Sequence, residues 1–227
     1  MTRRMTPRAP NRPTPSWPVV RGPATVAILA ASDRPADQLA SRLAALPGVG
    51  SVFVDEASGG PGDDLPAPAV PFRDLSVVRL GPLECLAAFE RFPDLVRHGP
   101  VLAIGPAILS TRALQLGAVA YLTTREIEEE LPAAVAAAIE GHRYLGASVV
   151  EGFVASGLAA AAAVSRLSAR ELEVVIHAGR DESPGRTAAA IGVAPEAVTR
   201  YRIRARMKLG LETTDDLVSF AIAHGLR

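Results

Sequence analysis

The sequence of 227 residues contains little lysine, little cysteine and few aromatic side chains. Lys208 is the only lysine among 24 basic residues, and Cys85 is the only cysteine. A lone cysteine excludes an intramolecular disulfide and a cysteine-based zinc site. The four histidines show no metal-ligand spacing with carboxylates or with Cys85. We therefore expect no metal and no cofactor, and a core built from Ala, Val, Leu and Ile.

Long apolar runs and the common catalytic motifs are absent as well. No stretch of about twenty residues is apolar enough to span a membrane. Residues 1–23 lack the continuous apolar segment of a signal peptide, so we expect a cytoplasmic protein without a membrane partner. The sequence has no G-x-G-x-x-G motif, no P-loop and no serine nucleophile elbow. These absences argue against an enzyme.

The formal net charge of zero conceals an uneven distribution along the chain. Residues 1–24 hold five arginines and no acid, residues 25–166 hold ten basic and sixteen acidic residues, and residues 167–227 hold nine basic and eight acidic residues. Six prolines between Pro7 and Pro23 oppose a helix or a core in the first segment. We expect residues 1–24 to be a disordered arm, either solvated or in contact with an acidic surface such as nucleic acid.

Residues 25–145 predict an α/β domain. Short apolar runs alternate with segments of helical periodicity, which is typical of a parallel sheet whose crossovers are helices. The five expected strands are 25–31, 51–54, 75–80, 101–104 and 119–122. The expected helices are 35–46, 83–96, 108–116 and 126–144. A segment rich in Pro and Gly, 57–71, replaces the helix expected between the second and third strands. Residues 146–166, which include the alanine-rich stretch 158–164, are expected to be a helical linker.

Residues 167–227 predict an all-α domain of four helices. Ser168 and Glu171 have the spacing of a capping box, which places the start of the first helix at Ser168. A break over 179–185, a turn at Gly192 and a proline suited to the first turn of the next helix, Pro195, then give the order helix, turn, helix.

The third helix of this group has a packing face and a basic face. Between Val198 and Gly210 the sequence has five basic residues and no acid. These residues are Arg200, Arg202, Arg204, Arg206 and Lys208. Such a helix suits a groove lined by phosphates, because each neutralised phosphate releases counterions and Arg can pair bidentately with guanine. A basic amphipathic helix can also be a solvated face, or bind a membrane or an acidic partner.

The fourth helix is more apolar than a solvated helix needs to be. Thr213 and Asp216 repeat the capping-box spacing before it, and Gly225 is suited to its end. Its apolar residues either pack within the domain or form a dimer contact. The dimer candidates are Leu217, Phe220 and Ala221.

Several strings in the last sixty or so residues resemble the LuxR/FixJ-type helix-turn-helix domain. The strings are 167–171, 189–193, 198–199, 208–210, 216–218, 221–222 and 224–226. The resemblance implies base contacts from Thr199, Arg200 and Ile203. It implies phosphate contacts from Arg202, Arg204, Arg206 or Lys208, which set affinity rather than sequence choice. The chain departs from the family at Ala194, where a Ser or Thr cap is usual, and at Ala197, where Thr is common.

Residues 25–145 resemble the receiver domain that commonly precedes this helix-turn-helix. The similarity is clearest at 99–105, 113–122 and 141–145. A working receiver needs acidic residues that hold Mg²⁺, a phosphoacceptor aspartate, a hydroxyl and a lysine. The corresponding positions here are Ser32 with Asp33, Arg79, Gly105 and Thr124.

This degenerate pocket implies a receiver that is not switched by phosphorylation. Arg79 cannot accept a phosphoryl group, and its charge repels Mg²⁺ while favouring either an ion pair with Asp33 or an acidic ligand. An alignment shifted along this segment would instead place Ser76 or Asp74 near the site.

Two hypotheses follow from these resemblances. The first is an atypical response regulator that binds double-stranded DNA specifically, as a homodimer or as a heterodimer with a related regulator. The alternative is an interaction protein whose receiver-like domain binds a partner or a small molecule, and which touches DNA only within that complex.

Overall fold

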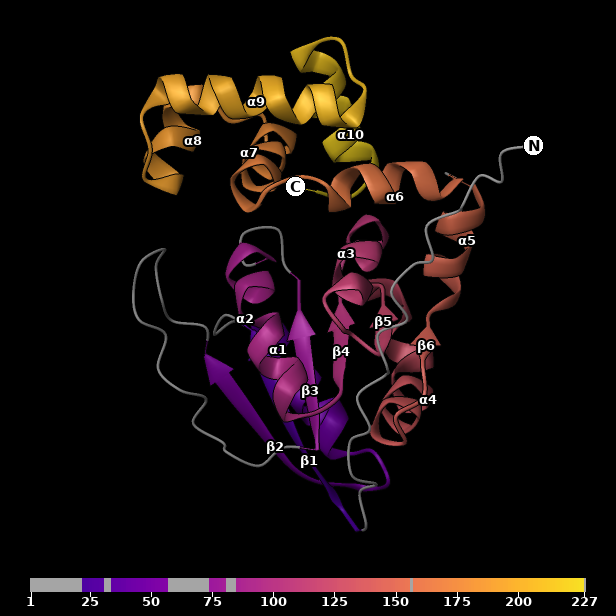
Figure 1. Cartoon of the computed structure of the whole chain (residues 1–227). Coiled ribbons are helices and arrows are strands. Elements are labelled where there is room, and N and C mark those ends of the chain that lie inside the picture. The colour runs from indigo at the N-terminus through magenta and orange to yellow at the C-terminus, as the bar shows by residue number, and fades with distance from the viewer. Residues whose placement is uncertain (1–21, 31–33, 57–73, 81–84, 156, 227) are drawn as a thin grey trace, which may run out of the picture.

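A six-stranded parallel sheet forms the N-terminal part of the chain, and helices form the rest (Figure 1). The computed structural model describes residues 22–30, 34–56, 74–80, 85–155 and 157–226. The strands are β1 (Ala24–Ala30), β2 (Val49–Glu56), β3 (Leu75–Arg79), β4 (Val101–Ile104), β5 (Ala120–Leu122) and β6 (Tyr144–Leu145). Their order in the sheet is β2-β1-β3-β4-β5-β6.

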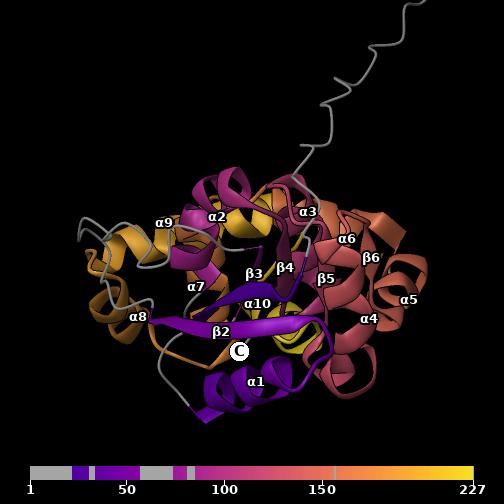
Figure 2. The ribbon, with the colours of Figure 1, turned by 90° about the horizontal axis from the view of Figure 1, so that it is seen from below.

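The helices of the sheet part connect successive strands. They are α1 (Arg34–Ala44), α2 (Cys85–His98), the 3₁₀ turn η1 (Ala107–Leu109), α3 (Ser110–Gln115), η2 (Thr124–Glu126) and α4 (Ile127–Ile139). Seen from below in Figure 2, α1 lies on one side of the sheet and α2 with α3 on the other. Connections of this kind are what parallel strands require, because a parallel neighbour cannot be reached by a tight hairpin.

Alternation along the strands explains why the sheet has a core on each face. In β1, Val26 and Ile28 join the cluster under α1 and α4, whereas Leu29 joins the cluster under α2 and α3. Successive strand residues point to opposite faces, and here both faces are covered. The strands are therefore almost continuously apolar, as the expected parallel sheet requires.

The expected number of strands, five, is wrong, because β6 adds a sixth. The helix expected over 126–144 ends earlier: α4 stops at Ile139, and Gly141 turns the chain with a φ of 76°. Tyr144 and Leu145 then pair with β5. A two-residue strand carries too little periodicity to be recognised in a sequence.

The segment expected to be a helical linker does contain helices, two of them, and both pack against the sheet part. They are α5 (Ala147–Ala155) and α6 (Gly157–Ser165). Val149 and Val164 are fully buried in the core cluster that also contains α3. Residues 1–21 and 57–73, and with them most of the expected arm and all of the Pro- and Gly-rich segment, lie outside the described residues.

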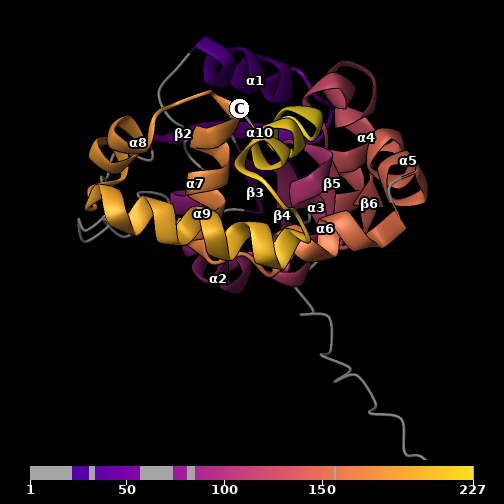
Figure 3. The ribbon, with the colours of Figure 1, turned by 90° about the horizontal axis from the view of Figure 1, so that it is seen from above.

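Four helices follow in the C-terminal part: α7 (Ala169–Gly179), α8 (Pro184–Ile191), α9 (Pro195–Leu209) and α10 (Thr214–Ala223). Both expected capping boxes are present: Ser168 with Glu171 before α7, and Thr213 with Asp216 before α10. Figures 1 and 3 show α9 at the end of the molecule away from the sheet, with α7 between them.

One apolar cluster joins the sheet part to the C-terminal helices. It runs from Phe92 of α2 through Leu172 and Ile176 of α7 to Leu217 of α10, all of them almost fully buried. Arg112 of α3 adds a polar contact across this junction by donating a hydrogen bond to the carbonyl oxygen of Leu167 at 2.8 Å. The two parts thus share a core.

No helix among the described residues is long and apolar enough to cross a membrane.

Candidate nucleic-acid interface and strand-end pocket

Helix α9 is held against α7 and α8 by its apolar face. Val198 and Ala205 are fully buried, and Val198 packs with Val174 of α7 and Ile191 of α8. The helix begins after Ala194, whose side chain cannot accept a capping hydrogen bond, and it ends at Gly210 in the left-handed region with a φ of 70°. Proline at the first helical position offsets part of the missing cap, because its φ is already helical.

The opposite face of α9 is exposed and carries all three residues predicted to contact bases. Thr199, Arg200 and Ile203 are exposed, and Arg204 lies beside them. The hydroxyl of Thr199 donates back to the carbonyl oxygen of Pro195 at 3.4 Å. These side chains form one stripe along the outer surface of the molecule, as their spacing of three to four residues requires.

Arg202, predicted as a phosphate contact, is turned toward its own domain. Its guanidinium donates a hydrogen bond to the carbonyl oxygen of Glu182 at 2.8 Å. The Nε atom is buried and has no hydrogen-bond partner in the described part of the chain, and burial lowers the pKa of Arg202. The same turn is fixed by His177, which pairs with the Glu182 carboxylate at 2.9 Å. Arg202 therefore anchors α9 to the turn that precedes α8.

Lys208 also faces the protein rather than solvent alone. Its ammonium group pairs with the buried carboxylate of Glu171 and donates to the carbonyl oxygen of Arg166 at 3.2 Å. Burial by itself would raise the pKa of Glu171. The hydrogen bonds from Lys208 and from the backbone of Ser168 outweigh that effect and hold the pKa below its ordinary value. Lys208 thus stabilises the capping box of α7.

Arg206 is half-buried, and its Nε atom is buried without a hydrogen-bond partner among the described residues. Of the four predicted phosphate contacts, only Arg204 is a plainly exposed cation without a hydrogen bond or ion pair within the described part of the chain. The helical periodicity could have shown that Lys208 differs from Arg204, since Lys208 lies at the border of the packed face. The pairing with Glu182 and Glu171 could not be inferred from the sequence, because Glu182 lies in the turn before α8 and Glu171 lies in α7.

Sequence reasoning overlooked Met207, which at 78% is the most exposed large apolar residue in the described part of the chain. It lies one turn beyond Ile203, which is 45% exposed, on the same stripe. The signal that could have revealed it was this spacing of four residues.

The predicted dimer residues of α10 differ in their exposure. Leu217 and Ala221 are fully buried in the core of their own chain, whereas Phe220 is half-buried and its ring lies 4.4 Å from that of His224. Ile222 of the same helix is 45% exposed. A partner in this arrangement would meet Phe220 and Ile222 rather than the other two.

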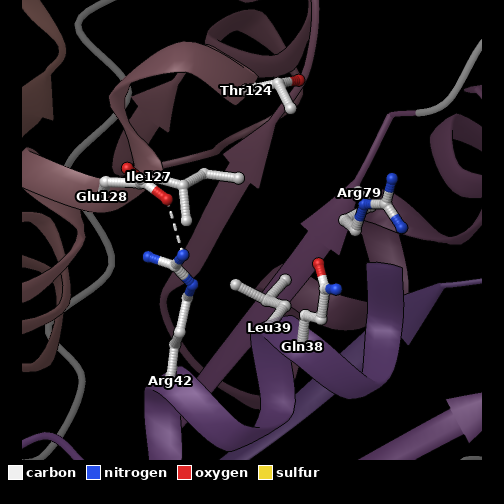
Figure 4. Close-up of a pocket in the computed structure, with 7 residues that line it drawn as sticks. All are labelled: Gln38, Leu39, Arg42, Arg79, Thr124, Ile127 and Glu128. Atoms are coloured by element: carbon white, nitrogen blue, oxygen red, sulfur yellow. Dashed lines mark hydrogen bonds and ion pairs between the residues drawn. The ribbon is translucent and has the colours of Figure 1, made fainter. Parts of the chain in front are cut away.

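At the carboxyl ends of the strands, Arg79 and Thr124 border one pocket of about 190 Å³ (Figure 4). Its lining also includes Gln38, Leu39, Arg42, Ile127 and Glu128. The carboxylate of Glu128 is paired with Arg42 at 2.7 Å. Ser32 and Asp33 lie outside the described residues, so the expected ion pair between Asp33 and Arg79 has no structural description here.

The structure shows at which end of the sheet the other residues considered for this pocket lie. Arg79 is the last residue of β3, at the same strand end as Gly105 after β4. Asp74 precedes β3 and accepts a hydrogen bond from the backbone of Thr25 at 2.7 Å, so it lies at the opposite end of the sheet. A Cβ atom at Gly105 would come 2.7 Å from the Cβ of Leu80, which excludes a hydroxyl side chain there without a shift of the backbone.

A second cavity, of about 400 Å³, lies between the strand ends and the end of α10. Thr123, Arg125 and Ser148 line it from the sheet part, and His224 and Gly225 line it from the C-terminal part. Burial lowers the pKa of His224, so its ring is the neutral form over a wider pH range than usual.

The chain is similar in sequence to a curated protein and in fold to solved structures. No family model matches it. A Pseudomonas aeruginosa protein named "Putative transcriptional regulator" is 26% identical over 205 residues, which are 88% of this chain and 98% of that protein. Salmonella enterica serovar Typhimurium RcsB bound to the promoter P1flhDC with phosphomimetic BeF3- has a TM-score of 0.57 at 18% identity. The chain has the fold of RcsB.

A second RcsB structure, bound to the promoter rprA in the presence of BeF3-, gives a TM-score of 0.56 at 16% identity. Each of these two comparisons covers 88% of this chain and 98% of RcsB. The likeness therefore extends across both the parallel sheet and the C-terminal helices.

Proposed function

We propose that this protein is a sequence-specific DNA-binding regulator of transcription, with α9 as the helix that enters the major groove. The observation that carries the proposal is the exposed stripe of α9, where Arg200 and Arg204 flank Thr199 and Ile203 while the opposite face packs. In helix-turn-helix proteins the second helix reads base edges in this way. The 26% identical relative is named as a transcriptional regulator, and RcsB, which shares the fold, is described on promoter DNA.

We divide the predicted contacts into two groups. Thr199, Arg200 and Ile203 are proposed to contact base edges, and Arg204 to contact phosphate. Arg202 and Lys208 are assigned to holding the domain together, because their donors already meet Glu182 and Glu171. Arg206 would need to leave its half-buried position to reach a phosphate.

The proposal is tested with the purified full chain and a pool of random-sequence duplexes. We expect selection of a common site, and binding that weakens with salt because phosphate neutralisation releases counterions. Arg200→Ala should relax the selected sequence, whereas Arg204→Ala should weaken binding to all sequences about equally. Binding that is unaffected by both substitutions, or no selected site even at low salt, would contradict the proposal.

We also propose that aspartyl phosphorylation does not switch this protein. Arg79 stands at the strand end where a receiver has its phosphoacceptor, and Gly105 has no room for the usual hydroxyl. Incubation with a small phosphodonor and Mg²⁺ should leave the mass of the protein unchanged. An added phosphoryl group, located by peptide mapping, would refute this part.

A dimer on DNA is the proposed assembly, since two recognition helices add their base readout on successive turns of the groove. Two copies of this chain and a pair with a related regulator are both compatible with α10. The second candidate function, binding of a small molecule or a protein partner by the sheet part, is favoured by the cavity that His224 and Arg125 share. A molecule bound there would contact both parts of the chain at once.

A further inference from the structure

The exposed stripe of α9 consists of two parallel lines of different chemistry. Arg200 and Arg204 form a basic line, four residues apart. Beside it, the methyl-bearing residues Thr199, Ile203 and Met207 form an apolar line at the same spacing. Ile203 is 45% exposed and Met207 78% exposed.

The folding of the helix does not account for this apolar line. Val198 and Ala205 already supply the face that packs against α7 and α8, and both are fully buried. A single exposed apolar residue is normal on a protein surface. Two exposed apolar residues lie one turn apart here, beside a basic line on an otherwise polar helix face. This arrangement indicates that a ligand covers them.

The spacing of the line fits the major groove. Four residues of α-helix rise about 6 Å, close to the roughly 6.8 Å between base pairs two steps apart in duplex DNA. The apolar group that a base pair offers in the major groove is the 5-methyl of thymine. We propose that Ile203 and Met207 recognise the methyl groups of thymines about two base pairs apart, with Arg200 and Arg204 on guanine or phosphate beside them.

Charge favours DNA over a second copy of the chain as the occupant of this face. An isologous contact between two α9 helices would bring Arg200 and Arg204 of each copy close to their counterparts, and like charges in contact are unfavourable. An acidic protein partner would satisfy the arginines equally, and the experiment below separates it from DNA. This inference rests on the proposed function and adds the bases that are read.

The test uses the site that the full chain selects from random duplexes. We expect thymine at two positions about two base pairs apart in each half-site. Replacing each of these thymines with uracil removes the 5-methyl group and keeps every hydrogen-bonding atom. Each replacement should weaken binding about fourfold, the loss expected for one buried methyl-sized group.

Variants then assign each methyl group to a side chain. Ile203→Ala should make binding insensitive to uracil at one position, and Met207→Ala should do so at the other. Val150→Ala is the matched control, because Val150 is 46% exposed but lies on α5, and the uracil effect should persist in it. Circular dichroism and urea unfolding of all three variants should match the wild type, since these side chains are exposed.

The outcomes separate this inference from the proposed function. A selected site whose affinity is unchanged by uracil at every thymine overturns the thymine reading and leaves DNA binding in place. Failure to select any site overturns both. Wild-type uracil sensitivity in Met207→Ala overturns the role of Met207. Binding of the full chain to an acidic protein through Arg200 and Arg204, with no selected DNA site, would overturn DNA as the occupant of this face.

Discussion

Lys208 is a basic residue of the proposed DNA-binding helix, but its contacts differ from those of Arg200 and Arg204. Its ammonium group sits on the carboxylate of Glu171, which is 3% exposed and also caps α7 through Ser168. Leaving a buried carboxylate without its partner lowers the stability of the protein strongly. Removing an exposed arginine such as Arg204 changes the stability little. The difference between these two cations is a matter of partners rather than of residue type.

We therefore expect Lys208→Gln to lower the free energy of unfolding by about 1–3 kcal/mol, the usual cost of leaving a buried polar group without its partner. Arg204→Gln is the matched variant, and its unfolding free energy should lie within about 0.5 kcal/mol of the wild type. Salt titrations of DNA binding should show the reverse, with a slope reduced by about 0.9 for Arg204→Gln and unchanged for Lys208→Gln. Equal salt slopes for both variants would argue that Lys208 reaches a phosphate after all.

At the scale of the element, α8 and α9 differ in how they begin. Ser183 caps α8 by accepting a hydrogen bond from the backbone of Arg186 at 3.3 Å. Ala194 occupies the same position before α9, with extended backbone angles of −71° and 146° but no oxygen to accept a bond. Helix α9, the proposed recognition helix, is thus the one of the two that begins without a side-chain cap, and the backbone N–H of Ala197 donates to the carbonyl oxygen of Ala194 at 2.9 Å instead.

Ala194→Ser should raise the free energy of unfolding by about 1 kcal/mol, because the backbone is already in the conformation that a capping serine needs. Ser183→Ala is the reciprocal control and should lower it by a similar amount. Urea unfolding followed by far-ultraviolet circular dichroism measures both. An unchanged or lower stability of Ala194→Ser would indicate that the first turn of α9 is satisfied in another way.

The sequence predicts well the elements that have a long apolar run or a capping motif. The apolar runs of β1, β3, β4 and β5 and the capping boxes at Ser168 and Thr213 are local signals, and the structure confirms them. β6 has two residues and follows a turn at Gly141, so it is too short to show an alternating pattern in the sequence. The core that joins α2 to α7 depends on contacts between residues more than seventy positions apart, which no local pattern contains.

The candidate site was also predictable only where a local pattern determines it. The outward direction of Thr199, Arg200 and Ile203 follows from the helical period once Val198 and Ala205 are taken as buried. The partners of Arg202 and Lys208 come from the turn before α8 and from α7, so their inward direction required tertiary structure. Gly105 is similar, because only the position of Leu80 shows that a larger side chain does not fit.

For the molecule as a whole, the junction between the sheet and the C-terminal helices combines apolar packing with a titratable group. His224 lines the cavity at this junction, near Pro106 and Arg125, and its ring contacts Phe220. Interfaces between domains that are large and apolar oppose relative motion of their parts. Burial favours the neutral form of His224, so we expect the resistance of this junction to relative motion to depend on pH.

Burial lowers the pKa of His224 from its ordinary value of 6.5 in the folded state. Protonation is thus easier where the ring is exposed, and the contribution of His224 to stability is present above pH 6.5 and is lost as the pH falls through the lowered pKa. Glu171, whose pKa is also lowered, contributes above its ordinary value of 4.5 and loses its contribution only below it. The two groups therefore act in separate pH windows.

We expect native-state hydrogen exchange, corrected for intrinsic rate, to show weaker protection of α10 at pH 5.5 than at pH 7.5. His224→Gln should remove most of this difference, because glutamine does not titrate in that range. His142→Gln is the control, since His142 is exposed and its partner Glu140, at 3.2 Å, is exposed too. If α10 loses the same protection in His224→Gln as in the wild type, the pH dependence of the junction comes from another group, and the neutral His224 ring is only a packing residue.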